Sequence, residues 1–290
     1  MPTYHLGALS GAPLSAAEDE SDPASSDPVF LSPKTWRKAL LTRKTPVSPD
    51  TKIFTFTLPS PSQTVGLPVG QHLMIRQRDP ATREAVIRAY TPLSEGSEKG
   101  ELNVLIKVYY DSPGGAPGGK MTQALDSLPL GHAVEFKGPV GKFEYLGAGQ
   151  CTINGKGRNV RRFVMVCGGS GITPIWAVLR AVMKDKGDAT GCLVLDGNRM
   201  EGDILLRDEL EEVEREGDGR CRVVHTLSRP GEGWTGRTGR MDRELFEKEV
   251  GKPPAERDVM VLICGPEGME KGAKTALLGM GWDEEDLLFF

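Results

Sequence analysis

A chain of 290 residues with a net charge of −4 and 38% hydrophobic residues has the size and composition of a globular protein with two domains. This slightly acidic balance excludes a strongly basic surface for nucleic acid or anionic lipid, and no apolar run approaches the ~20 residues that cross a bilayer, so no membrane is expected. Five scattered cysteines without a C-x-x-C pair favour a reducing compartment, the cytoplasm, and four widely spread histidines give no support for a metal site.

Residues 1–28 are rich in Ser, Ala, Pro, Asp and Glu. They contain no basic segment followed by an apolar one, so a signal peptide is not expected. Because this composition cannot bury enough apolar surface to offset the entropy of ordering, it predicts a disordered tail or an interdomain hinge.

Residues 29–149 show short strand patterns separated by Pro- and Gly-rich turns. In Lys52–Leu58, apolar and polar side chains alternate as on a half-buried strand. Further strands are expected over His72–Arg76, Leu102–Tyr110 and Ala133–Phe136, with one short helix over Met121–Leu128. This pattern predicts a small antiparallel β-barrel.

Two segments of this region have the residue types of a ligand site. In RAYTPLS, the planar guanidinium of Arg88 suits a pyrophosphate, Tyr90 offers a flat ring and Thr91 a hydroxyl. The alternative is an edge strand with a routine Arg and Tyr. In GGKMT (118–122), two glycines lead into a helix N-terminus, where backbone N–H groups can meet a phosphate. A plain helix start explains this second segment nearly as well.

From Arg162 onward, strands alternate with helices. The expected strand and helix pairs are 163–167 with 175–184, 192–195 with 203–215, 221–227 with 243–250, and 259–264 with 267–280. This alternation predicts an open parallel sheet in an α/β domain over 162–290, with residues 150–161 as a connector.

The turn GGSGITP (168–174) is the most informative segment. Thr173 as N-cap and Pro174 as first helical residue would open a helix whose N-terminus attracts a phosphate. The turn is not the fingerprint G-x-G-x-x-G, so a tight turn without a ligand remains an alternative. Ligands of parallel sheets bind at the carboxyl ends of strands, where this turn meets Gly197–Arg199 and Cys264–Pro266, and this convergence favours the nucleotide site.

Five motifs in this order resemble the ferredoxin-NADP reductase-type superfamily: RAYTPLS (88–94), GGKMT (118–122), KGPVGKFEY (137–145), GGSGITP (168–174) and CGPEGM (264–269). Within it, residues 29–290 are most similar to NADH-cytochrome b5 reductase and to the C-terminal flavin module of eukaryotic nitrate reductase. The fungal form is favoured by VFLSPKTW (29–36), GLPVGQHLMI (66–75), ALDSLPLG (124–131) and GKFEYLG (141–147). The resemblance implies an antiparallel β-barrel that binds FAD, followed by an α/β domain that binds NAD(P)H.

The resemblance also implies the site residues. FAD would be held by Arg88, Tyr90, Thr91, Pro92, Ile106, Lys107, Tyr109, Gly119, Lys120, Met121 and Thr122. The coenzyme would be held by Gly169, Gly171, Arg199, Ser228, Arg229, Gly265 and Pro266, and Thr173 would reach the flavin from the second domain. Thr91 and Lys107 at the flavin and Cys264 beside the nicotinamide would be catalytic, although a free Cys is often only a small buried residue. Thr122 departs from the usual Ser of the family but keeps the hydroxyl.

The coenzyme choice is predicted from Ser228. NADH-preferring relatives carry an acid at this position, which would repel the 2′-phosphate of NADPH. Ser228 carries no charge, and Arg199 and Arg229 add positive charge nearby. The sequence therefore predicts that NADPH is accepted and preferred.

The implied function is a flavoprotein oxidoreductase that takes hydride from NAD(P)H onto FAD and passes electrons singly to a haem acceptor of the cytochrome b5 type. Residues 1–28 leave no room for a molybdenum-cofactor domain, and the H-P-G-G stretch of a cytochrome b5 domain is missing. The chain is therefore expected to be the flavin module of an assimilatory nitrate reductase. The alternatives are a free-standing soluble NADH-cytochrome b5 reductase and a non-catalytic flavin- or nucleotide-binding protein.

Overall fold

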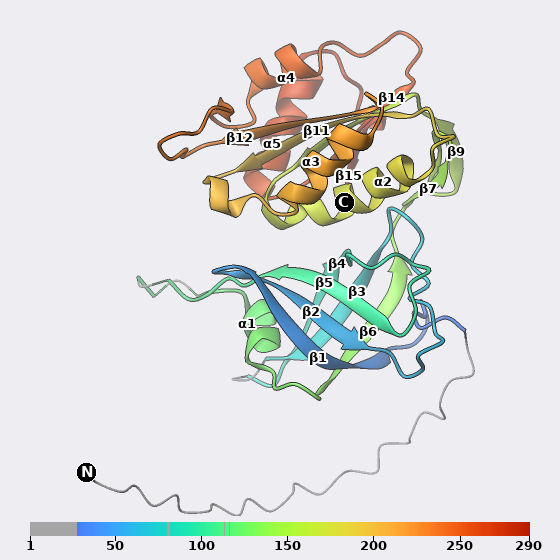
Figure 1. The fold of residues 1–290 in the computed structure, drawn as a ribbon, viewed down its shortest axis with the longest axis vertical. Helices are drawn as coiled ribbons and strands as arrows, with labels where there is room; N and C mark the ends of the chain where they lie inside the picture. The colour runs from blue at the N-terminus through green and yellow to red at the C-terminus, as the bar shows by residue number, and fades with distance from the viewer. Residues whose placement is uncertain (1–27, 80–81, 113, 116) are drawn as a thin grey trace, which may run out of the picture.

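The computed structural model describes residues 28–79, 82–112, 114–115 and 117–290, and the chain folds around two separate sheets stacked one above the other (Figure 1). The predicted tail or hinge, residues 1–28, lies outside the described residues except for Pro28. The predicted order, an antiparallel region followed by a parallel α/β region, is confirmed.

The first sheet has six antiparallel strands in the order β4-β3-β6-β1-β2-β5. Their bounds are β1 Arg37–Ser48, β2 Thr51–Thr57, β3 His72–Arg78, β4 Ala85–Tyr90, β5 Glu101–Lys107 and β6 Ala133–Val140. The sheet is rolled, because the segment after β4 returns to the opposite edge, where the Leu93 N–H donates to the Asn103 carbonyl in β5 at 2.8 Å.

Aromatic side chains fill the core inside the rolled first sheet. Phe54, Phe56 and Phe136 are fully buried, and the rings of Phe56 and Phe136 meet edge to face at 4.9 Å. Helix α1 (Lys120–Ser127) packs its buried Met121 and Leu125 into the same core, against β3 and β4. The apolar residues of the alternating pattern in β2, Phe54 and Phe56, therefore face the core as predicted.

Two predicted elements begin or end elsewhere. The strand predicted over Leu102–Tyr110 ends at Lys107, after which the chain forms a loop that leads to α1. The helix predicted from Asp203 begins at Arg207, because the Asp203 side chain accepts the Met200 N–H at 3.1 Å and closes a separate 3-10 turn, η2 (Glu201–Asp203).

A small antiparallel sheet joins the two halves. It consists of β7 Phe143–Gly147, β8 Gln150–Ile153 and β9 Lys156–Asn159. Residues 150–161, predicted as a connector, thus contain a hairpin whose turn residues Asn154 and Gly155 both have positive φ.

The second sheet has six parallel strands in the order β13-β12-β11-β10-β14-β15. Their bounds are β10 Arg162–Cys167, β11 Gly191–Asn198, β12 Cys221–Leu227, β13 Arg237–Thr238, β14 Val259–Cys264 and β15 Leu287–Phe289. The chain proceeds from β10 to β13 in one direction and then places β14 on the other side of β10. The order therefore reverses between β10 and β14, and ligands of such sheets bind at this reversal.

Helices cover both faces of the parallel sheet (Figure 1). Helices α2 Ile172–Lys184 and α3 Arg207–Glu216 pack on one face, and α4 Arg243–Glu249 and α5 Glu267–Gly279 pack on the other. The first face also receives Ile53, Leu93 and Leu105 from the antiparallel region, so apolar contacts bind the two halves together. Within the described residues, no helix is long and apolar enough to span a membrane.

Candidate functional site

The glycine turn after β10 lies at the point where the strand order reverses. Cys167 and Cys264 are register partners, so β10 and β14 end side by side. The Gly168 N–H donates to the Cys264 carbonyl at 3.3 Å, and a Cβ at Gly171 would overlap that same carbonyl oxygen. Only glycine therefore lets the turn lie this close to the end of β14.

The turn opens α2 differently from the prediction. Residues Gly169–Gly171 form a 3-10 turn, η1, and α2 then begins at Ile172 with Gly171 as its cap. Thr173 lies inside the helix, where its hydroxyl donates to the Ser170 carbonyl at 3.2 Å. The prediction that Thr173 caps the helix is wrong, because the glycines complete the turn before the threonine is reached.

The predicted coenzyme residues after β11 and β12 lie together. The Ser228 N–H donates to the Asn198 carbonyl at 3.0 Å, and the Arg229 N–H donates to the Arg199 carbonyl at 2.8 Å. The side chains of Arg199 and Arg229 are exposed, and neither forms an ion pair within the part of the chain that the structure describes. Two unpaired guanidiniums beside an uncharged serine suit a phosphate monoester.

Cys264 lies at the end of β14 and keeps its proton. Burial raises the pKa of its thiol to about 12, with a smaller contribution from the charge of Glu270. A neutral thiol can contact a ring but cannot act as a nucleophile at physiological pH. Gly265 donates its N–H to Glu270 at 3.0 Å, and Pro266 stands directly before α5. These two predicted residues therefore shape the backbone that follows β14.

The predicted flavin residues of β4 lie at one edge of the rolled sheet. The Arg88 guanidinium is exposed, donates only to the Ile87 carbonyl, and has no ion-pair partner in the described chain. Burial raises the pKa of Tyr90 to about 12, while the nearby charge of Arg88 opposes this rise and Tyr109 adds to it. These three side chains are therefore neighbours, and Tyr90 presents a neutral ring.

The loop before α1 is held by close backbone contacts. The Gly119 N–H donates to the Tyr109 carbonyl at 2.7 Å, and the Tyr109 N–H donates to the Thr122 hydroxyl at 3.2 Å. A Cβ at Gly118 would overlap the Tyr109 carbonyl, so this position requires glycine. Helix α1 packs beside β4, the strand that carries Arg88. An unpaired guanidinium, a helix N-terminus and a flat tyrosine fit the diphosphate and ring of FAD.

Several predicted flavin residues are buried in the core or contact other residues of the protein. Met121 and Ile106 are buried in the core, at 2% and 1% exposure. The Thr122 hydroxyl is engaged with Tyr109, and Lys120 lies 3.5 Å from Asp79.

Lys107 connects the two halves of the molecule. Its ammonium lies 3.0 Å from Asp50 and 3.4 Å from Asp203, which belongs to the α/β region. Burial lowers the pKa of Lys107, but the two carboxylates outweigh burial and leave it raised. The charged Lys107 therefore holds η2 against the end of β5, and the catalytic role assigned to it stays a prediction.

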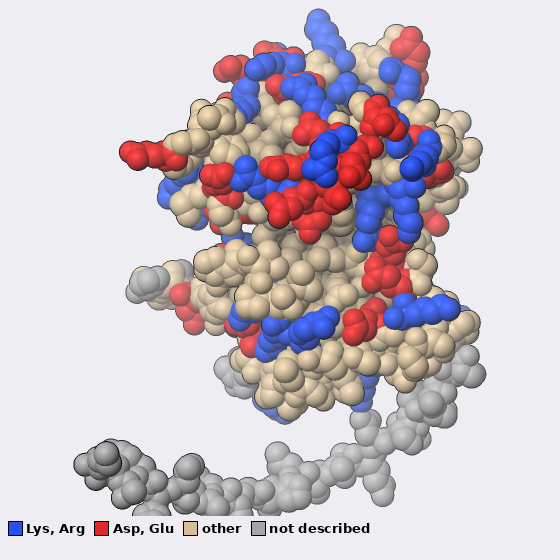
Figure 2. Space-filling model, in the orientation of Figure 1, with Lys and Arg blue, Asp and Glu red and all other residues tan. Residues whose placement is uncertain are grey.

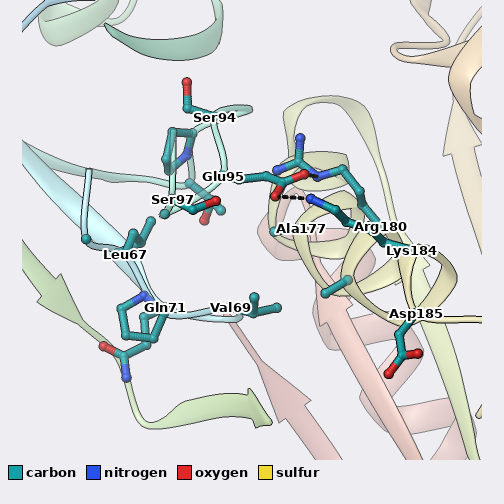
Figure 3. A pocket seen from close by; sticks show the side chains of 16 residues that line it. Leu67, Val69, Gln71, Ser94, Glu95, Ser97, Ala177, Arg180, Lys184 and Asp185 are labelled. Atoms are coloured by element: carbon teal, nitrogen blue, oxygen red, sulfur yellow. Dashed lines mark hydrogen bonds and ion pairs between the residues drawn. The ribbon is translucent and has the colours of Figure 1, made fainter. Parts of the chain in front are cut away.

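A cavity of about 570 Å³ opens between the two halves (Figure 3). One wall carries the predicted flavin residues Thr91 and Pro92, and the other carries Ala177 and Ala181 of α2. Glu95 crosses between the walls, 2.7 Å from Lys184 and 3.7 Å from Arg180. Sequence reasoning missed this contact, because nothing in the sequence pairs charges that lie 89 residues apart.

We expect the Glu95 ion pairs to give the protein a pH- and salt-sensitive contact. The bond from Lys184 holds the pKa of Glu95 below its ordinary value, so the stabilisation is complete above about pH 4.3 and is lost as the pH falls through the lowered pKa. Lys184 is mostly exposed, so the contribution is roughly 0.2–1 kcal/mol. Thermal unfolding of Glu95→Gln should show a lower Tm than the unmodified protein at pH 7, with the gap closing in acid or high salt. The exposed Glu232→Gln is the control, and a gap independent of pH and salt would contradict this reading.

Gly171→Ala should damage coenzyme binding while leaving the flavin half intact. The added Cβ would meet backbone atoms of Cys264 and Gly265, which cannot move without displacing the turn from β14. We expect kcat/KM for NADPH to fall at least about tenfold with FAD content unchanged. Gly272→Ala in α5, where an added Cβ meets nothing, is the matched control and should keep full activity. Equal activity of the two variants would contradict this account.

The predicted FAD residues and the predicted coenzyme residues meet at β5. The glycine turn η1 packs against β5, the strand that ends at Lys107. Figure 2 shows that the surface narrows between the two halves, with side chains of both charges interspersed over the α/β half. The arrangement can therefore bring a dinucleotide on the parallel sheet against a flavin on the antiparallel sheet.

Comparison with known proteins agrees with this geometry. A family model for the FAD-binding domain of oxidoreductases matches residues 38–145, and one for their NAD-binding domain matches residues 165–275. Over all of its length the chain is similar to "Nitrate reductase [NADPH]" of Neurospora crassa (58% identity) and of Beauveria bassiana (57% identity), of which it spans 30% and 33%. The cytochrome b5 reductase domain of Ulva prolifera nitrate reductase is 34% identical, with a TM-score of 0.83, and the match covers 90% of this chain and 99% of that one.

These matches define the class of protein: an NAD(P)H-dependent oxidoreductase that uses FAD. Within that class, the chain belongs to the family of cytochrome b5 reductase-type flavin modules of nitrate reductases. The resemblance, the enzyme class and the cofactors predicted from the sequence are confirmed. The chain spans about a third of the length of the curated relatives it matches.

Proposed function

We propose that this chain takes hydride from NADPH onto FAD and passes the electrons singly to a haem acceptor of the cytochrome b5 type, as part of an assimilatory nitrate reductase in the cytoplasm. The observation that carries the proposal is the packing of the glycine turn against β5, which joins the two predicted half-sites. We further propose that residues 29–149 and 162–290 act as the FAD and NAD(P)H domains, with residues 150–161 as connector and residues 1–28 as hinge.

Residues of the antiparallel half would hold and orient FAD, which accepts a hydride and releases electrons one at a time when bound. Arg88 and the N-terminus of α1 would bind its diphosphate, because Arg88 has no ion-pair partner in the described residues and the first turn of α1 contains no acidic residue. Tyr90 would lie flat against the ring system as a neutral phenol. Thr91, at 8% exposure, would place a hydroxyl next to the ring from a fixed position.

Residues of the parallel half would present the nicotinamide. The glycine turn would take the pyrophosphate, and Cys264 would contact the ring without adding charge, because burial keeps the thiol protonated. Leu93 and Leu105 of the antiparallel half pack against the core of the parallel half, and this apolar packing would keep water from the reacting rings.

The preference for NADPH is supported by the charges around Ser228. The exposed guanidiniums of Arg199 and Arg229 have no carboxylate partner in the described residues and follow the ends of β11 and β12. A 2′-phosphate placed there gains charge-assisted hydrogen bonds and meets no carboxylate at position 228.

Electron transfer assays test the proposal. Ferricyanide and cytochrome b5 should both be reduced by the chain with NADPH, and with NADH at lower kcat/KM, while nitrate should not be reduced by this chain alone. Reduction of ferricyanide without any reduction of cytochrome b5 would remove the haem acceptor from the proposal. A kcat/KM that favours NADH more than about tenfold would overturn the coenzyme preference.

A further inference from the structure

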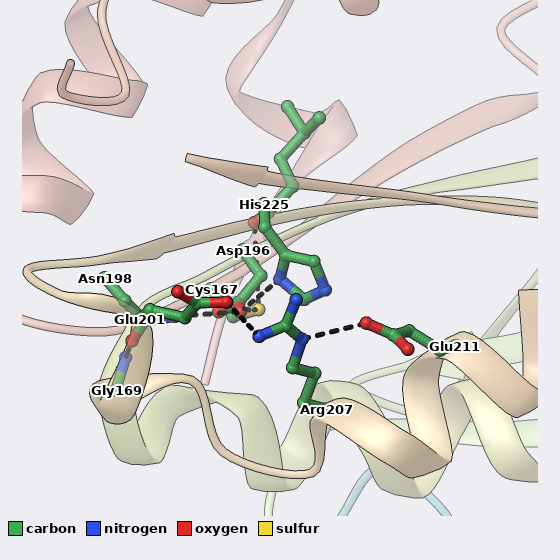
Figure 4. A network of polar contacts seen from close by, with 9 residues as sticks. Cys167, Gly169, Asp196, Asn198, Glu201, Arg207, Glu211 and His225 are labelled. Atoms are coloured by element: carbon green, nitrogen blue, oxygen red, sulfur yellow. Dashed lines mark hydrogen bonds and ion pairs between the residues drawn. The ribbon is translucent and has the colours of Figure 1, made fainter. Parts of the chain in front are cut away.

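A buried carboxylate lies near the glycine turn (Figure 4). Asp196 in β11 is 1% exposed. Its side chain lies 2.8 Å from the amide nitrogen of Asn198, 2.9 Å from Nδ1 of His225 and 3.6 Å from Sγ of Cys167. Cys167, Asp196 and His225 are register partners on β10, β11 and β12, so the three side chains form one row across the sheet.

Asn198, at the end of β11, contacts both parts of the proposed coenzyme site. Its side-chain oxygen accepts the Gly169 N–H at 3.2 Å, and its backbone carbonyl accepts the Ser228 N–H at 3.0 Å. Gly169 has a φ of +55°, which glycine adopts without strain, and the bond from its N–H to Asn198 ties the turn to the end of β11. One residue thus links the turn after β10 to the position after β12.

The orientation of the Asn198 amide is fixed by Asp196. The amide nitrogen donates to the carboxylate, which leaves the amide oxygen for the Gly169 N–H. The reversed amide would set its oxygen against the carboxylate and its NH₂ group against the N–H of the turn, so both contacts would be repulsive. Cys167 and His225 hold the carboxylate from the neighbouring strands.

We propose that Asn198 is a positioning residue that keeps the pyrophosphate turn and Ser228 in one fixed relation, with Asp196 setting its amide. This inference rests on the proposed function, in which the turn takes the pyrophosphate and Ser228 faces the ribose that carries the 2′-phosphate. The two groups belong to one coenzyme and are a fixed number of bonds apart. A site that binds both the pyrophosphate and this ribose must therefore hold its two contacting parts at a fixed separation.

Truncation of Asn198 tests the proposal. Asn198→Ala should raise KM for NADPH and Kd for NADP⁺ about tenfold, because a hydrogen bond at each contact of the side chain is lost. The FAD content and kcat at saturating NADPH should change less than about twofold, since Asn198 does not touch the reacting rings. Asn159→Ala, on the exposed strand β9, is the matched control and should match the unmodified protein.

Two more variants test the role of Asp196. Asn198→Asp keeps an oxygen for Gly169 but sets a second carboxylate against Asp196, so it should raise KM for NADPH more than Asn198→Ala does. Asp196→Asn keeps the shape of the side chain and should also raise KM, but its effect should not add to that of Asn198→Ala in the double variant. Full additivity would overturn the role assigned to Asp196.

Reduced nicotinamide mononucleotide separates positioning from general damage. This probe lacks the adenosine half, so the unmodified protein and Asn198→Ala should reduce their flavin with it at equal rates. An equal loss in the rate of flavin reduction with the mononucleotide and with NADPH would overturn the inference, and so would an unchanged KM for NADPH. If the unmodified protein is not reduced by NADPH or NADH at all, the proposed function fails instead, so the two failures are distinguishable.

Discussion

Ser228→Asp should turn the enzyme from NADPH toward NADH. The new carboxylate would follow β12 directly and face the 2′-phosphate of NADPH, while it could accept hydrogen bonds from the free ribose hydroxyls of NADH. Like charges at contact distance cost several kcal/mol, so we expect kcat/KM for NADPH to fall about 100-fold or more. The value for NADH should stay equal or rise. Steady-state ferricyanide reduction with both coenzymes measures the change.

Ser228→Asn is the matched control, because it adds nearly the same volume without the charge. It should lower kcat/KM for NADPH much less than Ser228→Asp does. If the two variants lose NADPH activity equally, bulk rather than charge sets the preference, and the proposed phosphate contact at Arg199 and Arg229 is wrong.

Arg88→Ala should release FAD. Arg88 is an exposed cation without an ion-pair partner in the described chain, so its removal leaves the fold of β4 untouched and takes away the charge-assisted bond to the diphosphate. We expect the Kd for FAD to rise about 100-fold and the purified variant to be largely colourless. Fluorescence titration with FAD measures the affinity.

The control is Arg43→Ala on β1, which removes another exposed arginine with only a long contact of 3.9 Å to Glu101. It should keep its flavin. An Arg88→Ala variant that retains FAD with unchanged affinity would contradict the assignment of the diphosphate to this edge of the sheet.

The sequence predicted the elements with strong periodicity. The alternating pattern of β2 and the apolar runs of β10, β11 and β14 were placed correctly, because burial on one or both faces dictates those residues. β1 was missed, since only Ala39 and Leu41 of its twelve residues are buried. The β8–β9 hairpin was also missed, although its Asn154-Gly155 turn is a typical hairpin sequence.

The position of the candidate site at the strand ends follows from the sequence pattern, whereas the side-chain contacts between distant segments do not. The parallel topology alone brings Gly169, Ser228 and Cys264 to one edge of the sheet. The Glu95–Lys184 contact across the cavity and the Asn198 link could not be foreseen, because many side chains of the same types have no such role. Thr173 shows a further limit: its place as cap depended on how the preceding glycines turn.

Anaerobic reduction of the bound flavin tests the central claim most directly. The folded chain should bind FAD in a roughly stoichiometric ratio, and addition of NADPH without oxygen should bleach the visible absorbance of the flavin. A folded chain that stays colourless in excess FAD, or a bound flavin that remains oxidised with both NADPH and NADH, would contradict the account.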